Sequence, residues 1–280
     1  MWIIPSQLDE IIDRTLHEDM GSGDVTTNAT VLPETQASAV AVARGPLVVC
    51  GGDVFARVFA RIESSVRFES LVPDGTRVGK GAKIWKVDGS ARALLMGERS
   101  ALNLTQRMSG VATLAHTFAE LVAGTGARIV DTRKTTPGLR TLERYAVRCG
   151  GAFNHRDNLS SAVLIKDNHI IAAGGITSAI ERARAHAPHT SRIEVEVQTL
   201  DELDEALAAK ADVILIDNFA LETLREAVTR GKGKAILEAS GGVNLSTVRA
   251  IAETGVDVIS VGALTHSAPA ADIALDLTLN

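Results

Sequence analysis

Residues 131–169 hold a local concentration of positive charge. The segment contains seven arginines and lysines against four acids, a net charge of +3, whereas the whole chain has a net charge of −5. Four of these cations follow apolar runs or lie in a polar turn, where a fold rarely needs a charge: Arg133, Lys134, Arg156 and Lys166. An arginine guanidinium matches a carboxylate or a phosphate with two parallel hydrogen bonds. Several converging cations therefore predict a substrate with several negative charges.

Other residues with chemical potential have plainer interpretations. Arg144 and Arg148 lie four residues apart, which suits either a binding role or a solvated helix face on which Glu143 pairs with them. Arg99 has the pattern of a surface arginine on a helix, and Cys149 that of a core thiol. The sequence pattern alone does not show that any of these side chains binds a substrate or takes part in catalysis.

Two acids, Glu196 and Asp217, come at the ends of apolar runs. In "RIEVEV" (192–197) the alternation places Glu194 and Glu196 on the same face of a strand. A carboxylate that faces the inside of a fold costs free energy of desolvation unless it is paired or binds a metal. Two interpretations stay open. One is a salt bridge to Lys166 or a neighbouring cation, and the other is a carboxylate pair for Mg²⁺ or substrate hydroxyls, because Mg²⁺ takes one or two carboxylates together with substrate phosphates.

Glycines follow two apolar runs near the C-terminus. They lie in "EASGGVN" (238–244) and "SVGALTHS" (260–267), and each stretch leads into a helical pattern. Such turns expose backbone N–H groups, which bind phosphate together with the N-terminus of the next helix. An ordinary strand–helix turn is the alternative. In α/β barrels a phosphate site commonly follows the last two strands, so the position of these glycines favours phosphate binding.

Six short apolar runs, separated by helical patterns, predict the elements that position these residues. The runs are residues 127–130, 162–165, 192–197, 211–216, 234–237 and 256–261. This alternation predicts βαβ units and a parallel sheet, either as a barrel or as an open doubly wound sheet. Polar or charged residues stand at the ends of the first five runs, and active sites of barrels lie at the carboxyl ends of the strands. The barrel is therefore favoured.

The first 110 residues mix helices and strands and predict an α+β domain. We expect the following elements: a helix at 5–19, two strands within 37–50, a helix at 51–62, antiparallel strands within 66–94, and a long helix at 94–124 that breaks at 109–110. The domains that follow are an N-terminal domain over 1–110 and a barrel domain over 111–268, with the tail 269–280 packed on the first.

Composition narrows the class of protein. The mild acidity argues against general binding to nucleic acid or to anionic membranes. No apolar run reaches the ~18 residues that a membrane span needs. The N-terminus lacks a basic start and carries acids by residue 9, which argues against a signal peptide. The two cysteines, Cys50 and Cys149, have no metal-type spacing and indicate a reducing compartment, so we expect a cytoplasmic protein.

These patterns alone predict a barrel enzyme that acts on a phosphorylated, multiply anionic substrate and uses Mg²⁺. No dinucleotide-binding fingerprint and no P-loop are present. A Schiff-base aldolase is the competing hypothesis, because Lys134 or Lys166 could be a desolvated amine. The density of arginines and the carboxylate pair count against it without excluding it.

Longer motifs carry a resemblance to a known family. They are "LHEDMGSGDVTT" (16–27), "GERSALNLTQRMSGVAT" (97–113), "DTRKTTPGLR" (131–140), "YAVRCGGAFNHRDNLS" (145–160), "LIKDNHI" (164–170), "IEVEV", "LIDNF", "EASGGV" and "GVDVISVGALTHS". In this order they resemble the quinolinate phosphoribosyltransferases over essentially the whole chain. One departure is Ala152 after Gly150-Gly151, where the family often has a third glycine.

The resemblance implies a fold, an assembly and a reaction. The fold is an N-terminal α+β sandwich joined to an incomplete, open α/β barrel of about seven strands, one of which the six apolar runs leave unassigned. The assembly is a homodimer whose active sites draw on both subunits. The reaction converts quinolinate and phosphoribosyl pyrophosphate to nicotinate mononucleotide, CO₂ and pyrophosphate in NAD biosynthesis, with Mg²⁺ as cofactor.

The resemblance also implies roles for individual residues. Four side chains bind the two quinolinate carboxylates: Arg133, His155, Arg156 and Lys166. Arg99 reaches in from the partner subunit, against its plainer interpretation above. Lys134 meets phosphoribosyl pyrophosphate, and Thr132 joins the substrate-binding set. Glu196 and Asp217 serve the ribose hydroxyls and Mg²⁺, and with Lys134 and Lys166 they form the catalytic set. The 5′-phosphate lies against the segments after the last two strands: Ser240, Gly241, Gly242, Val261, Gly262 and Ala263, with His266 nearby.

Two relatives of this family remain as alternatives. A nicotinate-using phosphoribosyltransferase shares the barrel and the phosphate site but needs fewer cations, because its substrate has one carboxylate. Homologues associated with molybdenum transport point to a non-catalytic role in anion binding. The intact "LIKDNH" and "NHR" motifs favour the enzyme.

Overall fold

The computed structural model describes residues 3–280, and its internal contacts divide the chain into two compact units. Unit 1 holds the residues up to 116 together with 135–151 and 265–280, and unit 2 holds 117–134 and 152–264. Met1 and Trp2, the start of the segment that we interpreted as lacking a signal peptide, lie outside the described residues. The predicted domain boundaries stay a prediction.

Unit 1 is built on an antiparallel sheet with the strand order β12-β1-β5-β3. A short antiparallel pair, β2 with β4, lies in the same unit. The strands are β1 (Gln36–Ala43), β2 (Leu47–Val48), β3 (Arg67–Ser70), β4 (Arg77–Val78), β5 (Lys83–Ser90) and β12 (Ile273–Leu279). The last strand brings the C-terminal tail onto the first, with Ala37 opposite Leu279 and Ala43 opposite Ile273.

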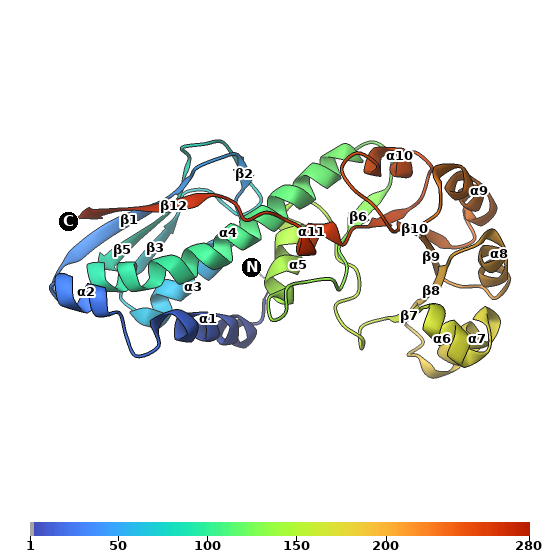
Figure 1. Ribbon diagram of the computed structural model, residues 1–280, viewed down its shortest axis with the longest axis horizontal. Helices are drawn as coiled ribbons and strands as arrows, with labels where there is room; N and C mark the ends of the chain where they lie inside the picture. Colours follow the sequence, from blue (N-terminus) through green and yellow to red (C-terminus); the bar gives the residue numbers. More distant parts are fainter. Residues whose placement is uncertain (1–2) are drawn as a thin grey trace. The chain divides into compact units, whose positions relative to one another are not determined.

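Helices cover this sheet and close its core (Figure 1). They are α1 (Pro5–Met20), α2 (Val25–Thr30), α3 (Gly52–Ile62) and the N-terminal part of α4 (Ala91–Leu121), while α5 (Arg140–Cys149) belongs to the same unit but lies away from this sheet (Figure 1). The core is aromatic at its centre, because the rings of Phe55, Phe59 and Trp85 are fully buried. The Phe55 ring packs edge-to-face on Phe59 and at a tilt on Trp85, each at a centroid distance of 5.0 Å. The predicted helix at 5–19 is confirmed and buries Leu8, Ile11, Ile12 and Leu16.

The predicted break at Ser109–Gly110 is wrong, since α4 continues through both residues. Small residues stand there because other segments approach the helix closely. A Cβ on Gly110 would lie 1.9 Å from the carbonyl oxygen of Pro269. The Ser109 hydroxyl lies 3.1 Å from both the backbone nitrogen and the backbone oxygen of Cys50. The pair therefore marks a site of close packing rather than the end of a helix.

Unit 2 is built on a six-stranded parallel sheet with the order β6-β11-β10-β9-β8-β7. All six predicted strands are confirmed: β6 (Arg128–Val130), β7 (Val163–Ile165), β8 (Ile193–Val197), β9 (Val213–Asp217), β10 (Ile236–Ser240) and β11 (Val258–Ser260). An isolated parallel bridge joins Phe153 to Val130 and adds one residue beside β6. The fold is thus the open α/β barrel with an N-terminal α+β unit that the sequence predicted.

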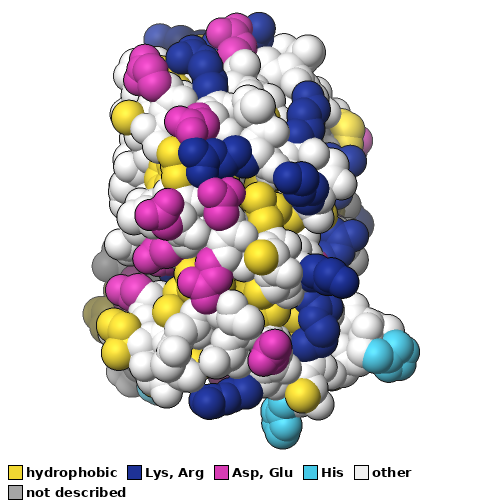
Figure 2. Space-filling model, turned by 90° about the vertical axis from the view of Figure 1, so that its right-hand side faces the viewer, with side chains coloured by type: hydrophobic (Ala, Val, Ile, Leu, Met, Phe, Trp, Pro, Cys, Tyr) yellow, Lys and Arg dark blue, Asp and Glu magenta, His cyan; other side chains and the backbone are white. Residues whose placement is uncertain are grey.

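Helices connect these strands: α6 (Asp167–Ala173), α7 (Ile176–His186), α8 (Leu200–Ala208), α9 (Leu221–Gly231), α10 (Val248–Ala252) and the one-turn α11 (Ala263–His266), which ends in unit 1. Helices α7, α8 and α9 lie along one side of the strands (Figure 1). Their outer faces carry charges of both signs (Figure 2), for example Arg230 on α9, which pairs with Asp204 on α8 at 2.6 Å. Among the described residues, no helix has both the length and the apolar character needed to cross a membrane.

Candidate active site

Strand register places the predicted site residues of unit 2 at one end of the sheet. In adjacent strands, Glu196 of β8 lies opposite Leu215 of β9, and Leu215 lies opposite Glu238 of β10. Residues paired in this way share a face of the sheet. Asp217 of β9 and Ser240 of β10 are paired two residues further toward the carboxyl ends of the strands. The segments that follow the other strands hold the remaining residues: Thr132, Arg133, Lys134, Lys166, Gly241, Gly242, Val261, Gly262 and Ala263.

His155 lies between two buried carboxylates. Its Nε2 is 3.3 Å from Oε1 of Glu194 and 3.5 Å from Oε1 of Glu238. Both glutamates are at least nine-tenths buried, and within the described part of the chain Oε1 of Glu238 makes no hydrogen bond. Asp131 fixes the backbone, since its carboxylate accepts the N–H of His155 at 2.7 Å and the side-chain amide of Asn154 at 2.6 Å. Three segments of the barrel therefore hold one imidazole.

The carboxylates keep this imidazole protonated. Burial by itself would lower the pKa of His155, but the neighbouring carboxylates of Glu194 and Glu238 outweigh it and raise that pKa to about 10. Burial raises the pKa of Glu194, and repulsion from Glu238 adds to this effect while His155 opposes it. The backbone N–H of Arg156 donates to Nδ1 of His155 at 2.7 Å, and this hydrogen bond favours an Nδ1 that carries no proton. Two buried carboxylates without a neutralising charge cost more free energy than one unfavourable contact between the Arg156 N–H and a protonated Nδ1. The cluster therefore keeps a proton at neutral pH.

Arg133 and Arg156 converge next to this cluster. Arg156 is partly buried, and its guanidinium donates to the backbone oxygen of Ala162 at 3.3 Å. Burial lowers the pKa of Arg156, and the positive charge of Arg133 lowers it further. Two guanidinium groups whose positive charges repel each other favour an anion between them. Arg133 and Lys134 are exposed, and the Thr132 hydroxyl fixes the turn by accepting the N–H of Lys134 at 3.1 Å.

Lys166 forms an ion pair with Glu196. Lys166 follows β7, and its Nζ contacts Oε2 of Glu196 on the neighbouring strand β8. The Glu196 side chain is 10% exposed and that of Lys166 is 45% exposed, so the ammonium still meets solvent. The salt bridge that the sequence left as one of two interpretations is therefore present. It does not exclude the other interpretation, because one carboxylate oxygen can bind a lysine while the group also meets a ligand.

The glycine turn after β10 packs on the end of β9. Gly241 has a φ of +91°, and a Cβ there would lie 2.1 Å from Oδ1 of Asn218. Asn218 is itself left-handed, with a φ of 59°, and its side chain donates to Asp217 at 2.8 Å. A Cβ on Gly242 would meet no atom within 4 Å. Gly241 thus packs against Asn218, which in turn contacts Asp217, while Gly242 has free space beside it that a ligand can occupy.

The segment after β11 is tied less strongly to a phosphate site. Helix α11 begins at Ala263, so the N–H groups of Gly262 and Ala263 lie where the helix starts, but the helix has only four residues. His266 belongs to unit 1, and its Nδ1 lies 2.6 Å from the Ser267 hydroxyl. Arg99, the other predicted site residue of unit 1, has a side chain that is 59% exposed and lies 3.9 Å from Glu98.

Glu143 has a different partner from the one that its helix neighbours suggested. It is fully buried and binds the guanidinium of Arg107 at 2.8 Å, and the hydroxyl and N–H of Thr136 donate to it at 2.7 and 3.0 Å. This network holds the start of α5 within unit 1. The prediction that Glu143 pairs locally with Arg144 and Arg148 is wrong, because Glu143 forms a buried ion pair with Arg107.

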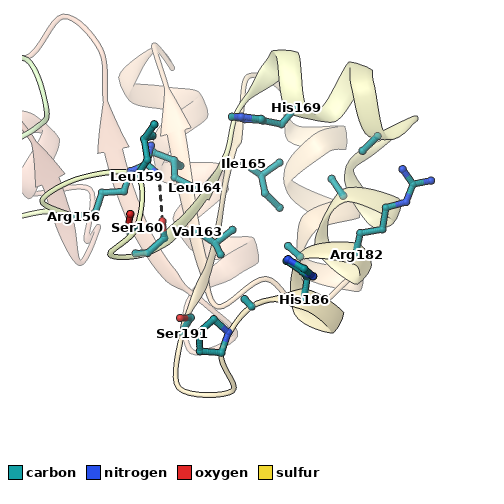
Figure 3. A pocket seen from close by; sticks show the side chains of 16 residues that line it. Arg156, Leu159, Ser160, Val163, Leu164, Ile165, His169, Arg182, His186 and Ser191 are labelled. Atoms are coloured by element: carbon teal, nitrogen blue, oxygen red, sulfur yellow. Dashed lines mark hydrogen bonds between the residues drawn. The ribbon is translucent and has the colours of Figure 1, made fainter.

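A cavity of about 620 Å³ lies beside β7, α6 and α7 (Figure 3). Arg156 and Leu159 line one side, and Arg182 and His186 line the other. Of the residues that line it, Arg156 alone belongs to the predicted site. The chemistry-bearing side chains lie instead at the strand ends, so this cavity is not the site that the sequence predicted.

Sequence reasoning missed the carboxylates that hold His155. Glu194, Glu238 and Asp131 received no role, although each acid stands inside or directly after an apolar run. All three are buried, at 6%, 3% and 0% exposure. The available signal was the alternation in "IEVEV", which places Glu194 inside the barrel together with Glu196.

Comparisons with known proteins agree over the full length. Residues 24–109 match the model of the quinolinate phosphoribosyl transferase N-terminal domain, and residues 111–276 match that of the C-terminal domain. The nicotinate-nucleotide pyrophosphorylase (carboxylating) of Mycobacterium leprae is 44% identical over 274 residues, which cover 96% of each chain.

Solved structures give the same result for the fold. The crystal structure of NadC from Streptococcus pyogenes superposes with a TM-score of 0.96 at 40% identity and covers 100% of this chain and 99% of that one. The nicotinate-nucleotide pyrophosphorylase of Ehrlichia chaffeensis has a TM-score of 0.93 at 41% identity, with 99% and 100% coverage.

Proposed function

The chain belongs to the quinolinate phosphoribosyltransferase family, and from this premise we propose how its residues carry out the family's reaction. It is a phosphoribosyltransferase of NAD biosynthesis that joins quinolinate to phosphoribosyl pyrophosphate and releases CO₂ and pyrophosphate. One observation carries the assignment of roles: the cations Arg133, Arg156 and Lys166 and the protonated cluster of His155 lie on segments that meet at the carboxyl ends of the strands.

We assign the two quinolinate carboxylates to these cations. Arg156 and Arg133 bind one carboxylate between their guanidinium groups. The carboxylate offsets the repulsion from Arg133, which together with the larger effect of burial lowers the pKa of Arg156. Lys166 and His155 meet the other. The net charge of the His155 cluster is negative, so its task is to orient the imidazole and to keep a proton there, while Lys166, which is paired with Glu196 and still 45% exposed, brings an ammonium group to the same carboxylate.

We assign the ribose and the metal to Glu196 and Asp217. They stand near the ends of neighbouring strands and supply carboxylate oxygens, the ligand type that Mg²⁺ takes together with phosphates and water, so the residues fit this ion. When bound, Mg²⁺ would neutralise charge on the leaving pyrophosphate. The carboxylates also tolerate the positive charge that develops on the ribose. Lys134 lies on the adjacent turn and binds an anionic group of phosphoribosyl pyrophosphate.

The 5′-phosphate belongs to the turn after β10, with Ser240 and the open side of Gly242. Backbone N–H groups of such turns bind phosphate oxygens without a side chain. The segment Val261–Gly262–Ala263 completes the cradle from the next strand. Support for this part comes chiefly from the left-handed glycines, because the helices that follow both strands are short.

The reaction needs orientation more than a covalent intermediate. Pyrophosphate leaves the anomeric carbon as the pyridine nitrogen attacks it, and the ring becomes a cation. The carbon next to that nitrogen then loses CO₂, and the electrons of the broken bond stay beside the positive nitrogen until a proton arrives. Fixed positions for both substrates lower the barrier by up to ~7–11 kcal/mol in ideal cases. Arg133, Arg156 and Lys166 provide this positioning.

We further propose that the protein acts as a homodimer in the cytoplasm. The exposed side chain of Arg99 on unit 1 is available to a partner's site. Both cysteines are free thiols, which fits a reducing compartment. A mixture of Arg99→Ala and Arg133→Ala chains tests the shared site. Shared sites predict that random mixing restores about a quarter of wild-type activity, because half of the dimers gain one intact site. Activity that stays at the level of the single variants contradicts sharing.

One assay tests the proposed function directly. Purified protein is supplied with phosphoribosyl pyrophosphate and either quinolinate or nicotinate, with Mg²⁺ or with a chelator. We expect nicotinate mononucleotide from quinolinate only when Mg²⁺ is present. Equal turnover of nicotinate would instead identify an enzyme for the monocarboxylate, and no product from either would leave an anion-binding role.

A further inference from the structure

The fold brings the two cysteines of this chain together. Cys50 and Cys149 are 99 residues apart in sequence, and they are the chain's only cysteines. In unit 1 their Sγ atoms lie within 4.8 Å of each other, and both are free thiols. Neither residue belongs to the site described above. A pair of thiols in contact, in a chain that uses no other cysteine, requires a physical account.

The two thiols differ in exposure and in support. Cys50 follows β2 and is fully buried, with its backbone held by the Ser109 hydroxyl at 3.1 Å. Cys149 ends α5 and is partly exposed. Burial raises the pKa of Cys50, and its hydrogen bond to Cys149 adds to the effect. That same hydrogen bond lowers the pKa of Cys149, although burial opposes this.

The neighbouring acid does not turn this pair into a metal site. Asp74 lies within 4.8 Å of both sulfurs. Its two carboxylate oxygens, however, accept the N–H groups of Gly51 and Gly52 at 2.9 and 3.1 Å, and Tyr145 donates to it at 2.9 Å. Asp74 thus binds the first backbone donors of α3, as a helix cap does. The two sulfurs remain as the reactive part of the cluster.

We propose that Cys149 and Cys50 form a redox site that hydroperoxides oxidise to a reversible intramolecular disulfide. The Cys149 thiolate attacks a peroxide oxygen, so that an S–O bond forms, the O–O bond breaks and the leaving hydroxide takes a proton to become water. The Cys50 sulfur then attacks the sulfenic sulfur of Cys149. The S–S bond forms, the S–O bond breaks, and the leaving hydroxide takes the proton of Cys50. Two thiols lose two electrons, and one hydrogen peroxide becomes two waters.

This assignment follows from the unequal thiols. Attack by a thiolate requires a low pKa and access for the oxidant, which Cys149 has and Cys50 lacks. The resolving thiol must be close and needs no access of its own. Both cysteines belong to one unit, so the bond requires no rearrangement of the chain between units. A thiol reductant restores the pair, as for other transient disulfides of reducing compartments.

The test uses the full-length protein and hydrogen peroxide. We expect the number of titratable thiols in the denatured protein to fall from two to none. The intact mass should fall by about 2 Da, the loss of two hydrogens, and dithiothreitol should reverse both changes. Digestion without reductant should release one peptide pair joined through Cys50 and Cys149. Thiols that stay unreacted, a disulfide between two chains, or a tightly bound zinc ion with both sulfurs protected would each overturn the proposal.

Two matched variants test the order of events. In Cys50→Ser, oxidation should stop at a sulfenic acid on Cys149 that dimedone traps. In Cys149→Ser, Cys50 should stay reduced under the same exposure. Faster reaction of Cys50 than of Cys149 would contradict the assignment.

Discussion

The imidazole Nε2 of His155 lies 3.3 Å from Oε1 of the buried Glu194. A second buried carboxylate, that of Glu238, lies 3.5 Å from the same nitrogen. This arrangement fixes the position of one substrate-binding residue and ties its protonation to the stability of the barrel. It also means that the region around the substrate carboxylates contains negative charge, which Arg133, Arg156 and Lys166 must exceed.

The first prediction concerns stability and pH. The pKa of His155 rises from 6.5 to about 10 on folding, so its contribution to stability is complete below pH 6.5 and is lost as the pH rises toward 10. Burial raises the pKa of Glu194, which gives a loss in the same direction. Denaturant unfolding across this window should show a falling free energy of unfolding. In Glu194→Gln the slope should be smaller, with a cost of about 3 to 5 kcal/mol at neutral pH. An identical slope in wild type and variant would show that this cluster does not contribute to the pH dependence of stability.

The second prediction concerns the two arginines. Arg133→Ala and Arg156→Ala should each raise the KM for quinolinate about 10- to 100-fold, the value of one or two charge-assisted hydrogen bonds. The KM for phosphoribosyl pyrophosphate should change much less. Steady-state kinetics with each substrate varied in turn measures the difference. Arg182→Ala, at the far side of the cavity beside α7, serves as the control and should leave both KM values unchanged. Unchanged quinolinate KM values in both arginine variants would refute the carboxylate assignment.

The third prediction concerns the acids at the ends of β8 and β9. Glu196→Gln and Asp217→Asn keep the size of each side chain and remove its charge. Each should lower turnover and raise the Mg²⁺ concentration for half-maximal rate, by about 10-fold. Mg²⁺ titrations of the rate measure this shift. If Glu196 serves only its ion pair with Lys166, the metal dependence of Glu196→Gln will match that of the wild type.

The fourth prediction compares neighbouring glycines. A methyl on Gly241 collides with Asn218 at 2.1 Å, whereas a methyl on Gly242 meets nothing within 4 Å. Both residues have positive φ, so each alanine costs about 1 kcal/mol of backbone strain. Gly241→Ala should cost more than Gly242→Ala in thermal unfolding and should also displace Asp217. Gly242→Ala should act mainly on the KM for phosphoribosyl pyrophosphate. Equal losses of stability would show that the packing of Asn218 on the turn does not matter.

Local patterns were sufficient for the elements and for much of the site. Each predicted barrel strand was an apolar run of four to six residues, and such runs form buried strands regardless of what they contact. The pairing of Lys166 with Glu196 was accessible because both stand at strand ends, which meet in a parallel sheet. The parallel sheet has six strands, and beside β6 the structure shows only the single bridge of Phe153 to Val130, which leaves no pattern in the sequence.

The errors share a cause, which is contact between distant segments. Gly110 continues a helix because Pro269, more than 150 residues later, packs on it. Glu143 binds Arg107 of another helix instead of its own neighbours. His155 gains its carboxylates from β8 and β10, and no local spacing records that meeting. The roles of Arg99 and His266 came from the family resemblance alone.

The fate of the two quinolinate carboxylates tests the central claim most directly. Quinolinate is labelled in the carboxylate beside the ring nitrogen, and in a second preparation in the other carboxylate. Label in CO₂ and in nicotinate mononucleotide is then measured against the pyrophosphate released. We expect the first label to leave entirely as CO₂, one per pyrophosphate, and the second to stay entirely in the product. Pyrophosphate release without CO₂, or label from both positions in CO₂, would contradict the claim.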